Sequence, residues 1–232
     1  MQARDFKDAV FTQQARIAGA FASPKRLELI DLLAQGERPV DALAREANLT
    51  VANTSRHLQI LKSANLVTAR KVGLRVFYRL ADDHVGQGYR ALQRLAEVRL
   101  ADMERLARDY FGTADGLEPV DRAELLRRAR RREVVVIDVR PPEEYVAGHI
   151  AGALSVPLPQ LERRLAGIPK RKRVVAYCRG PYCVLAAEAV RRLRARGYRA
   201  VRLTDGYPEW HDAGLPVAAG PERGARAQRL HA

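Results

Sequence analysis

The 232-residue sequence contains only two cysteines, Cys178 and Cys183, which lie five positions apart in the second half of the chain. Two cysteines cannot build the multi-disulfide framework of a small secreted protein. A C-x4-C spacing without a second pair also lacks half of the ligands of a usual zinc site. The function of these cysteines therefore has to be inferred from the residues around them.

Long hydrophobic runs are missing as well. No apolar run approaches the roughly 18 residues that a membrane-spanning helix needs. The N-terminal segment contains acidic residues and no continuous apolar core, so it does not have the pattern of a secretory signal. From these absences we expect a cytoplasmic protein with no membrane partner.

Acidic residues are too few to balance the basic ones, and the formal net charge is +14. The surplus is uneven, because residues 1–119 carry a net charge of +3 and residues 120–232 a net charge of +11. Global charge is therefore weak evidence for nucleic-acid binding here, and a local stripe of basic residues would be better evidence.

Glycine, proline and small polar residues gather at positions 111–121 and predict a domain boundary. We expect a first domain over 1–112, a linker over 113–119 and a second domain over 120–218. Residues 219–232 are polar, rich in arginine and without periodicity, which predicts a disordered tail.

The first half has the pattern of a mainly α winged helix-turn-helix. Helices are predicted over 6–21, from Pro24 to Gly36 with Ser23 as N-cap, over 40–49, and from an N-cap at Thr50. Residues 67–80 alternate apolar and basic side chains around Gly73, which predicts a β-hairpin wing. Residues 84–111 have the apolar stripe of one long amphipathic helix.

The basic stripe expected of a DNA-binding protein occurs in this half. No acidic residue lies between Leu49 and Ala81, whereas six basic residues do. In a winged helix the third helix enters the major groove by its N-terminus, and the wing contacts the backbone or the minor groove. The predicted DNA-contacting residues are Asn53, Thr54, Ser55, Arg56, His57, Gln59, Arg70, Lys71 and Arg75.

The segments "LTVANTSRHLQILKSANLV" and "ARKVGLRVFYRL" resemble the ArsR/SmtB winged-helix repressors. The resemblance implies double-stranded operator DNA as partner and a homodimer formed through helices near 6–21 and 84–111. Many members sense metals, but this chain has no cysteine before Cys178 and only His84 in its last helix. We therefore expect no metal site and no cofactor.

In the second half, β-branched strands at 133–140 and 173–179 alternate with a helix at 184–197 and a further strand, which predicts an α/β domain with a parallel sheet. Cys178 follows one of these strands and precedes a short turn and a helix. Backbone amides of the turn and the positive end of the helix would lower the pKa of the Cys178 thiol and make it a nucleophile.

Residues 135–158 and 174–217 resemble the N-terminal signature, the active loop and the closing motif of rhodaneses. The resemblance implies that Cys178 accepts sulfur within a loop whose length fits a sulfurtransferase better than a phosphatase. The predicted catalytic residues are Cys178, Arg179, Gly180, Tyr182, Cys183, Asp138 and Arg140. For Arg140 two interpretations stay open, a structural salt bridge and a charge near the sulfur.

The loop departs from the rhodanese pattern at two positions. Cys183 replaces the usual arginine or threonine, and Pro181 lacks an N–H group. Cys183 either resolves a persulfide on Cys178 by forming a disulfide or is a bystander. We expect weak turnover.

We therefore predict a transcriptional regulator, most simply a repressor, that senses reactive sulfur or thiol oxidation through Cys178. The ligand of the second domain would be a small sulfur donor or an oxidant. The alternatives are an active sulfurtransferase tethered or dimerised by its winged helix, and a rhodanese domain that is an inert docking module.

Overall fold

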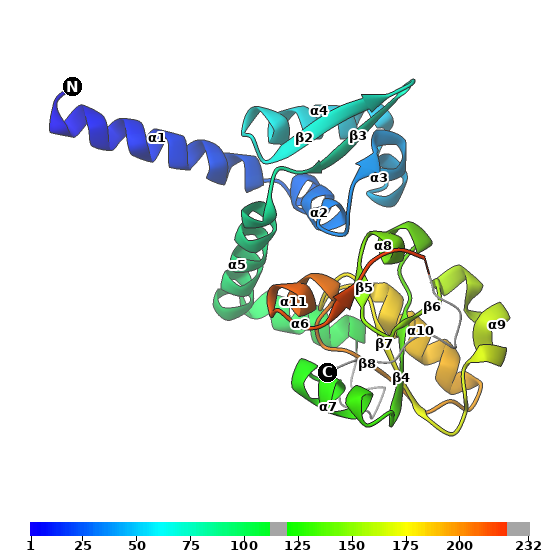
Figure 1. Cartoon of the computed structure of the whole chain (residues 1–232). Coiled ribbons are helices and arrows are strands. Elements are labelled where there is room, and N and C mark those ends of the chain that lie inside the picture. The colour runs from blue at the N-terminus through cyan, green and yellow to red at the C-terminus, as the bar shows by residue number, and fades with distance from the viewer. Residues whose placement is uncertain (112–119, 222–232) are drawn as a thin grey trace. The chain divides into compact units, whose positions relative to one another are not determined.

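A computed structural model describes residues 1–111 and 120–221 (Figure 1). The chain divides into two compact units between Ala101 and Asp102. The predicted linker at 113–119 and most of the predicted tail lie outside the described residues, so both stay predictions.

The first unit combines helices with a small antiparallel sheet whose strand order is β1-β3-β2. Its elements are α1 (Ala3–Phe21), α2 (Pro24–Leu33), β1 (Arg38–Pro39), α3 (Val40–Glu46), α4 (Val51–Ser63), β2 (Val67–Val72), β3 (Arg75–Leu80) and α5 (Asp83–Arg99).

Local signals place these elements as the sequence predicts. Ser23 is the N-cap of α2 and Pro24 is its first residue. Thr50 caps α4, since its hydroxyl accepts a hydrogen bond from the backbone N–H of Asn53 at 3.2 Å. Gly73 has a φ of +58° between the paired residues Val72 and Arg75, a conformation that suits glycine in a tight hairpin. The winged helix-turn-helix is confirmed.

The core of this unit lies between α2, α3 and α4. Leu29, Ile30, Leu43, Leu58 and Leu61 have no exposed surface. They belong to one hydrophobic cluster that also includes residues of the wing. The core therefore fixes α4 against α2 and α3, and it leaves the opposite face of α4 for solvent or a ligand.

The prediction of one long helix over 84–111 is wrong. The structure has α5 up to Arg99 and a separate α6 (Ala101–Phe111), with Leu100 in an extended conformation. No glycine or proline lies at the break. The apolar stripe is exposed within the single chain, and α6 has no buried residue, so no core packing holds the two segments in one continuous helix.

The second unit is an α/β fold around a four-stranded parallel sheet of order β6-β4-β7-β8. Besides α6, its elements are α7 (Arg122–Arg130), β4 (Val134–Asp138), α8 (Pro142–Ala147), β5 (His149–Ile150), β6 (Leu154–Ser155), η1 (Leu158–Gln160), α9 (Leu161–Arg164), η2 (Leu165–Gly167), β7 (Arg173–Tyr177), α10 (Val184–Ala195), β8 (Ala200–Arg202), α11 (Tyr207–Asp212) and β9 (Val217–Ala218). β5 and β9 form a separate antiparallel pair.

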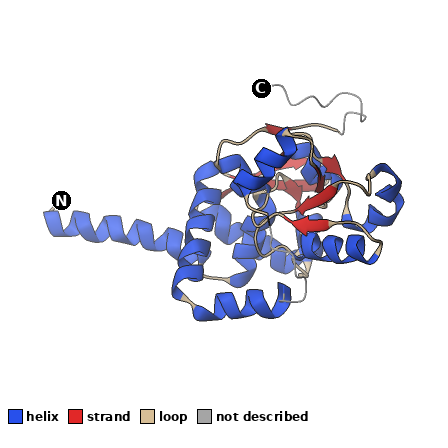
Figure 2. Ribbon diagram, turned by 90° about the horizontal axis from the view of Figure 1, so that it is seen from below, coloured by secondary structure: helices blue, strands red, loops and turns tan. Residues whose placement is uncertain are grey.

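The side chains of successive residues in the central strand β7 are buried on opposite faces of the sheet. Val174 and Ala176 belong to the cluster that contains α10 residues, whereas Val175 and Tyr177 belong to the cluster that contains Leu125 of α7 and Trp210 of α11. Helices therefore cover both faces, as Figure 2 shows with strands in red and helices in blue. Buried on both sides, β7 delivers the residue after it, Cys178, to the carboxyl edge of the sheet.

Candidate functional site

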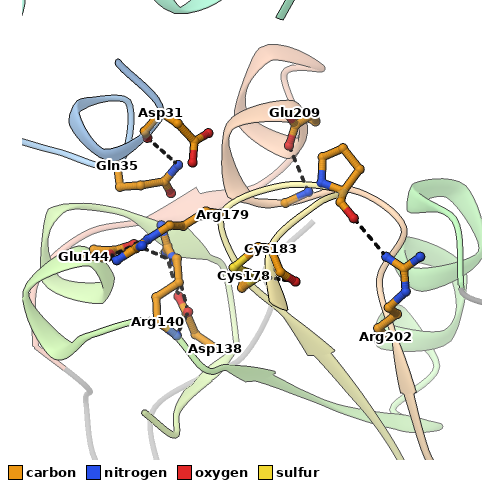
Figure 3. Close-up of a disulfide and its surroundings, with 12 residues drawn as sticks. Asp31, Gln35, Asp138, Arg140, Glu144, Cys178, Arg179, Cys183, Arg202 and Glu209 are labelled. Atoms are coloured by element: carbon orange, nitrogen blue, oxygen red, sulfur yellow. Dashed lines mark hydrogen bonds and ion pairs between the residues drawn. A yellow bond between two sulfur atoms is a disulfide. The ribbon is translucent and has the colours of Figure 1, made fainter. Parts of the chain in front are cut away.

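The two cysteines lie at opposite ends of one loop and are joined by a disulfide (Figure 3). Cys178 directly follows β7, and Cys183 is the N-cap of α10. Their Cα atoms are 6.3 Å apart, within the range of roughly 4.4–6.8 Å that disulfides need. Cys178 is 2% exposed and Cys183 is partly buried. The loop therefore brings together the two sulfur atoms that the sequence singled out.

A tight turn separates the two cysteines. The Cys183 N–H donates to the carbonyl of Gly180 at 3.1 Å, which places Pro181 at the second position of the turn. That position favours the fixed φ of proline. The Pro181 carbonyl accepts a hydrogen bond from the guanidinium of Arg202 at 3.3 Å. Pro181 therefore removes one backbone N–H donor from the loop, and its fixed φ makes the turn more rigid.

The segment before α11 holds this loop from the other side. The Tyr207 N–H donates to the carbonyl of Cys178 at 3.0 Å. A Cβ at Gly206 would lie 2.3 Å from the carbonyl carbon of Arg179 and from the nitrogen of Gly180. Only glycine lets the two backbones approach this closely. The loop is therefore clamped at its first residue and along its backbone.

Arg179 is engaged by a buried carboxylate. Its Nε lies 3.0 Å from Oε1 of Glu144, a residue that is 1% exposed. Arg179 is one of the predicted catalytic residues, and this ion pair uses its charge to compensate Glu144. The sequence has no local signal for this tertiary pairing, which links α8 to the loop.

Beneath the loop, a second ion pair is fully buried. Arg140 and Asp138 have no exposed surface, and the Arg140 Nη2 lies 2.6 Å from Oδ2 of Asp138. Arg140 also donates to the Gly148 carbonyl at 2.7 Å, and the Tyr177 hydroxyl donates to Asp138 at 2.6 Å. Burial alone would lower the pKa of Arg140, but the Asp138 carboxylate outweighs it and raises that pKa. This geometry favours the salt-bridge interpretation of Arg140.

Tyr177 joins the network from β7, where it pairs with Asp138 in the strand register. Its hydroxyl also accepts a hydrogen bond from the Ile150 N–H at 3.1 Å. Burial, with the Asp138 charge beside it, raises the pKa of Tyr177 well above its ordinary value. The ends of β4 and β7 are therefore tied together directly below Cys178.

The other two predicted loop residues, Gly180 and Tyr182, lie in the turn itself. Gly180 accepts the turn hydrogen bond through its carbonyl, and its Cα lies toward Glu209, whose Oε1 would be 3.7 Å from a Cβ at that position. Tyr182 is 36% exposed at the tip of the turn. Both positions are thus backbone or surface elements of the loop.

In the winged helix, three of the predicted contact residues are well placed for phosphates. Arg56 on α4 and Lys71 and Arg75 on the wing are exposed, and the described residues give them no ion pair. Asn53 is also exposed and Ser55 is half-buried, both in the first turns of α4. These side chains form the candidate DNA interface.

Other predicted contact residues have partners inside the unit. The Arg70 Nε lies 2.7 Å from Oε1 of Glu37, and this hydrogen bond lowers the pKa of Glu37. The amide of Gln59 donates to the Tyr78 hydroxyl at 3.1 Å and so links α4 to the wing. His57 is half-buried, and its Nδ1 has no partner among the described residues.

Thr54 requires a correction. It has no exposed surface, and its hydroxyl donates to the Thr50 carbonyl at 2.9 Å. The helical period turns this position toward the core, so the side chain does not contact DNA in this conformation. A short polar side chain near a helix N-terminus suggested an interface, whereas here it satisfies a backbone group.

Within residues 1–111 and 120–221, no three histidine, cysteine or acidic side chains gather as metal ligands would. No helix in these ranges combines the length and apolar character needed to cross a bilayer.

A winged helix followed by an α/β unit with a cysteine loop at the end of its central strand defines a DNA-binding regulator fused to a rhodanese-like domain. Residues 23–69 match the family "Bacterial regulatory protein, arsR family", and residues 121–213 match "Rhodanese-like domain". The chain belongs to the ArsR family of transcriptional regulators and carries a rhodanese-like domain after its winged helix. The predicted family and fold class are confirmed.

The chain is similar over nearly its whole length to the HTH-type transcriptional regulator Rv0324 of Mycobacterium tuberculosis, with 46% identity over 93% of this chain and 95% of that protein. It is also similar to a protein of Allochromatium vinosum named "Sulfurtransferase". The two are 35% identical over a region that covers 40% of this chain and 86% of that protein. Among solved structures, a winged helix-turn-helix domain of Mycobacterium bovis described as homodimeric is 39% identical, with a TM-score of 0.40, over 44% of this chain and 93% of that one.

The exposed and the paired cations of the first unit should differ in their effect on DNA binding. We expect Arg56→Ala or Arg75→Ala to weaken binding and to reduce the slope of log affinity against log salt by about 0.9, because each removes one phosphate contact. Arg70→Ala should reduce it less, since Glu37 already engages Arg70. Fluorescence anisotropy over a salt series measures the slopes; equal slopes for all three variants would contradict this assignment.

The close approach at Gly206 predicts a steric effect on the cysteine loop. We expect Gly206→Ala to destabilise the fold by about 1–3 kcal/mol and to slow formation of the Cys178–Cys183 disulfide, because the added methyl must displace backbone. Gly167→Ala is the matched control, since nothing lies within 4 Å of a Cβ there. Urea unfolding measures the stability and thiol titration measures the rate of disulfide formation. If Gly206→Ala and Gly167→Ala behaved alike in both, the close contact of Gly206 with the cysteine loop would not matter.

The buried Tyr177 hydroxyl predicts a pH-dependent contribution to stability. The folded state retains this proton at pH values where the unfolded chain loses it, so the free energy of unfolding falls as the pH rises above about 10. Tyr177→Phe should cost about 1–3 kcal/mol at pH 7 through the lost bond to Asp138. The difference in the free energy of unfolding between wild type and Tyr177→Phe, measured by urea unfolding, should then become smaller between about pH 9.5 and 11. A difference that stays constant over this range would exclude the linkage.

Proposed function

We propose that this ArsR-family regulator senses reactive sulfur or thiol oxidation in its rhodanese-like domain. Cys178 is the group that reacts, and Cys183 is the resolving thiol. The observation that carries the proposal is the placement of both cysteines in one clamped loop, with Cα atoms 6.3 Å apart and the sulfurs bonded. A redox pair of this kind records exposure to an oxidising sulfur species in a covalent and reversible form.

The chemistry proceeds in two balanced steps. The Cys178 thiolate attacks the sulfane sulfur of a persulfide or polysulfide donor, which leaves as a thiolate shorter by one sulfur, and Cys178 becomes a persulfide. The Cys183 thiolate then attacks Sγ of Cys178. This forms the disulfide and releases the outer sulfur as hydrosulfide, so two thiols are oxidised and one sulfane sulfur is reduced. A peroxide reaches the same disulfide through a sulfenic acid and loss of water.

Several features support Cys178 as the reacting group. It follows β7 and precedes α10, whose first turn contains no acidic residue and whose N-cap forms no side-chain hydrogen bond. The N–H groups at that helix end therefore favour an anion on a nearby sulfur. The Cys178 Sγ lies 3.5 Å from the Cys183 carbonyl, so the two residues already meet.

The clamp suggests how the state of the cysteines would alter the protein. The loop contacts Tyr207 and Gly206 on one side and Arg202 on the other, and Arg179 reaches Glu144 on α8. Opening or closing the disulfide changes the geometry of residues that contact three separate segments. For regulation, the two states must differ in DNA affinity by about 1–3 kcal/mol, or roughly 5- to 150-fold.

We also propose that the regulator acts on operator DNA as a homodimer in the cytoplasm. Residues 1–19 are all exposed within the single chain, although α1 carries Phe6 and Phe11 at 55% and 62% exposure. An isolated helix of this length is marginal in water, so another surface must cover its apolar side. Leu92 and Leu95 of α5 are similarly exposed. A cavity of about 420 Å³ is lined by residues of α1, α2 and α5, including Phe21, and supports the same helices as the contact surface.

The sensing proposal is tested with the full chain and a duplex that it selects from a random-sequence pool. Affinity is measured after treatment with a thiol-free reductant and after sodium tetrasulfide. For the wild type we expect a change of at least fivefold between the two states, and none for Cys178→Ser. Mass spectrometry should find the disulfide in the wild type. In Cys183→Ser it should find a mass increase of about 32 Da on Cys178, which is one added sulfur atom.

Two outcomes would reject the proposal. Wild-type affinity that is the same in both states excludes sensing through this loop. Steady sulfur transfer from thiosulfate to an acceptor that needs Cys178 but not Cys183 would favour the sulfurtransferase instead.

A further inference from the structure

The cysteine site does not use the excess positive charge of the second half of the chain, which carries a net +11. Part of the arginines there are paired within helices, as Arg127 and Arg128 are with Glu124, and Arg191 and Arg192 with Glu188. Eight further cations lie in residues 130–132, in residues 170–173 and at Arg199. We call these eight residues the basic edge.

The topology brings the basic edge together. Residues 130–132 come just before β4, residues 170–173 lead into β7, and Arg199 comes just before β8. In the parallel sheet Val134 pairs with Arg173, and Val174 pairs with Ala200. Neighbouring strands lie about 4.8 Å apart, so the three segments meet at the amino edge of the sheet. A hydrogen bond of 2.6 Å from Arg199 to the Arg171 carbonyl joins two of them directly.

The charges of the basic edge are poorly compensated. Seven of its eight residues are exposed, and Arg173 is half-buried. The one acidic residue directly next to these segments is Glu133, whose carboxylate lies 4.0 Å from Arg131 with both side chains largely exposed. Like charges crowded on one edge repel one another and weaken the folded state. Stability alone therefore does not account for this cluster.

Arg132 gives a second, independent indication. It ends α7 in the left-handed conformation, with φ +58°, and the N–H of Glu133 donates to the Arg128 carbonyl at 3.0 Å. This is the helix-ending motif in which glycine is favoured, and α10 ends in the same way with Gly197 at φ +80°. The arginine here adopts a conformation that its backbone disfavours, which is consistent with a role for its side chain.

The basic edge and the cysteine loop lie at opposite ends of β7. Arg173 begins the strand, and Cys178 follows its last residue. Five residues of extended strand separate them by roughly 17 Å. A ligand on the basic edge therefore does not cover the cysteine site.

We propose that the basic edge is a second DNA-binding surface, which contacts the phosphate backbone without reading its sequence. Clustered arginine and lysine side chains complement a phosphate backbone and release its counterions. The same chain carries a winged helix of a DNA-binding family, so duplex bound there is present at high effective concentration for any other surface of the chain. DNA is thus the polyanion with the highest effective concentration near the basic edge.

The test uses the reduced full chain and a labelled mixed-sequence duplex of about 40 base pairs, because phosphate contacts need no operator. Lys170→Gln, Arg171→Gln and Lys172→Gln are combined in one variant. Its control combines Arg127→Gln, Arg163→Gln and Arg191→Gln, which remove the same charge from α7, α9 and α10, outside both the basic edge and the predicted dimer helices. Anisotropy is measured from 50 to 300 mM salt (roughly the range over which such slopes are defined).

We expect the basic-edge variant to lose about 2–3 units of the slope of log affinity against log salt, and the control to lose less than one. Equal slopes for the two variants would overturn the proposal. It would also be overturned if the basic-edge variant kept its DNA affinity but lost binding to phosphatidylglycerol vesicles, which would assign the edge to membranes. Cys178→Ser should keep the wild-type slope, so this result is independent of sulfur sensing.

Arg132→Gly separates binding from folding. Glycine relieves the left-handed backbone, so the melting temperature should stay the same or rise, while the salt slope should fall by about 0.9. An unchanged slope together with a raised melting temperature would show that Arg132 does not contact DNA and would count against the basic edge.

Discussion

The buried Asp138–Arg140 pair is the interaction on which the cysteine site depends. It lies at the end of β4, and the Tyr177 hydroxyl ties it to the end of β7. Breaking a buried ion pair by removing one partner typically costs about 3–5 kcal/mol, because the remaining charge is left uncompensated. Here that charge would lie beside the last residue of the strand that carries Cys178. The network therefore determines where the loop begins.

The conformation of the cysteine loop above this network is determined by backbone contacts more than by side-chain contacts. Gly206 allows its segment to touch the Arg179–Gly180 backbone, and Tyr207 holds the Cys178 carbonyl. Arg179 extends from the loop to Glu144, so the loop supplies one of the cations that stabilise this buried carboxylate, beside Arg140 at 3.9 Å. A change in the loop thus affects groups that are costly to leave unpaired, and this cost favours two discrete loop conformations over a continuous range of them.

The sequence predicted best those features that depend on neighbouring residues. The Thr50 cap, the Gly73 hairpin and the strand before Cys178 follow from local conformational preferences, and the structure has each of them. Features that depend on tertiary packing were missed or misjudged. The break at Leu100 follows from an uncovered apolar stripe, Thr54 is turned inward by its neighbours, and Arg179 finds a carboxylate 35 positions away. None of these has a signature in the residues around it.

A resolving cysteine changes what a rhodanese loop is suited to do. A catalytic rhodanese must regain its thiolate after each transfer. In the proposed chemistry, by contrast, the sulfur that Cys178 accepts is released as hydrosulfide when Cys178 forms the disulfide with Cys183. The nucleophile is then lost until a reductant restores it, so the reaction stops after one event per loop. A stoichiometric and reversible product is a poor basis for turnover, but it is what a regulator needs in order to register a chemical signal. The substitution that should slow catalysis is thus the same one that makes the loop usable as a sensor.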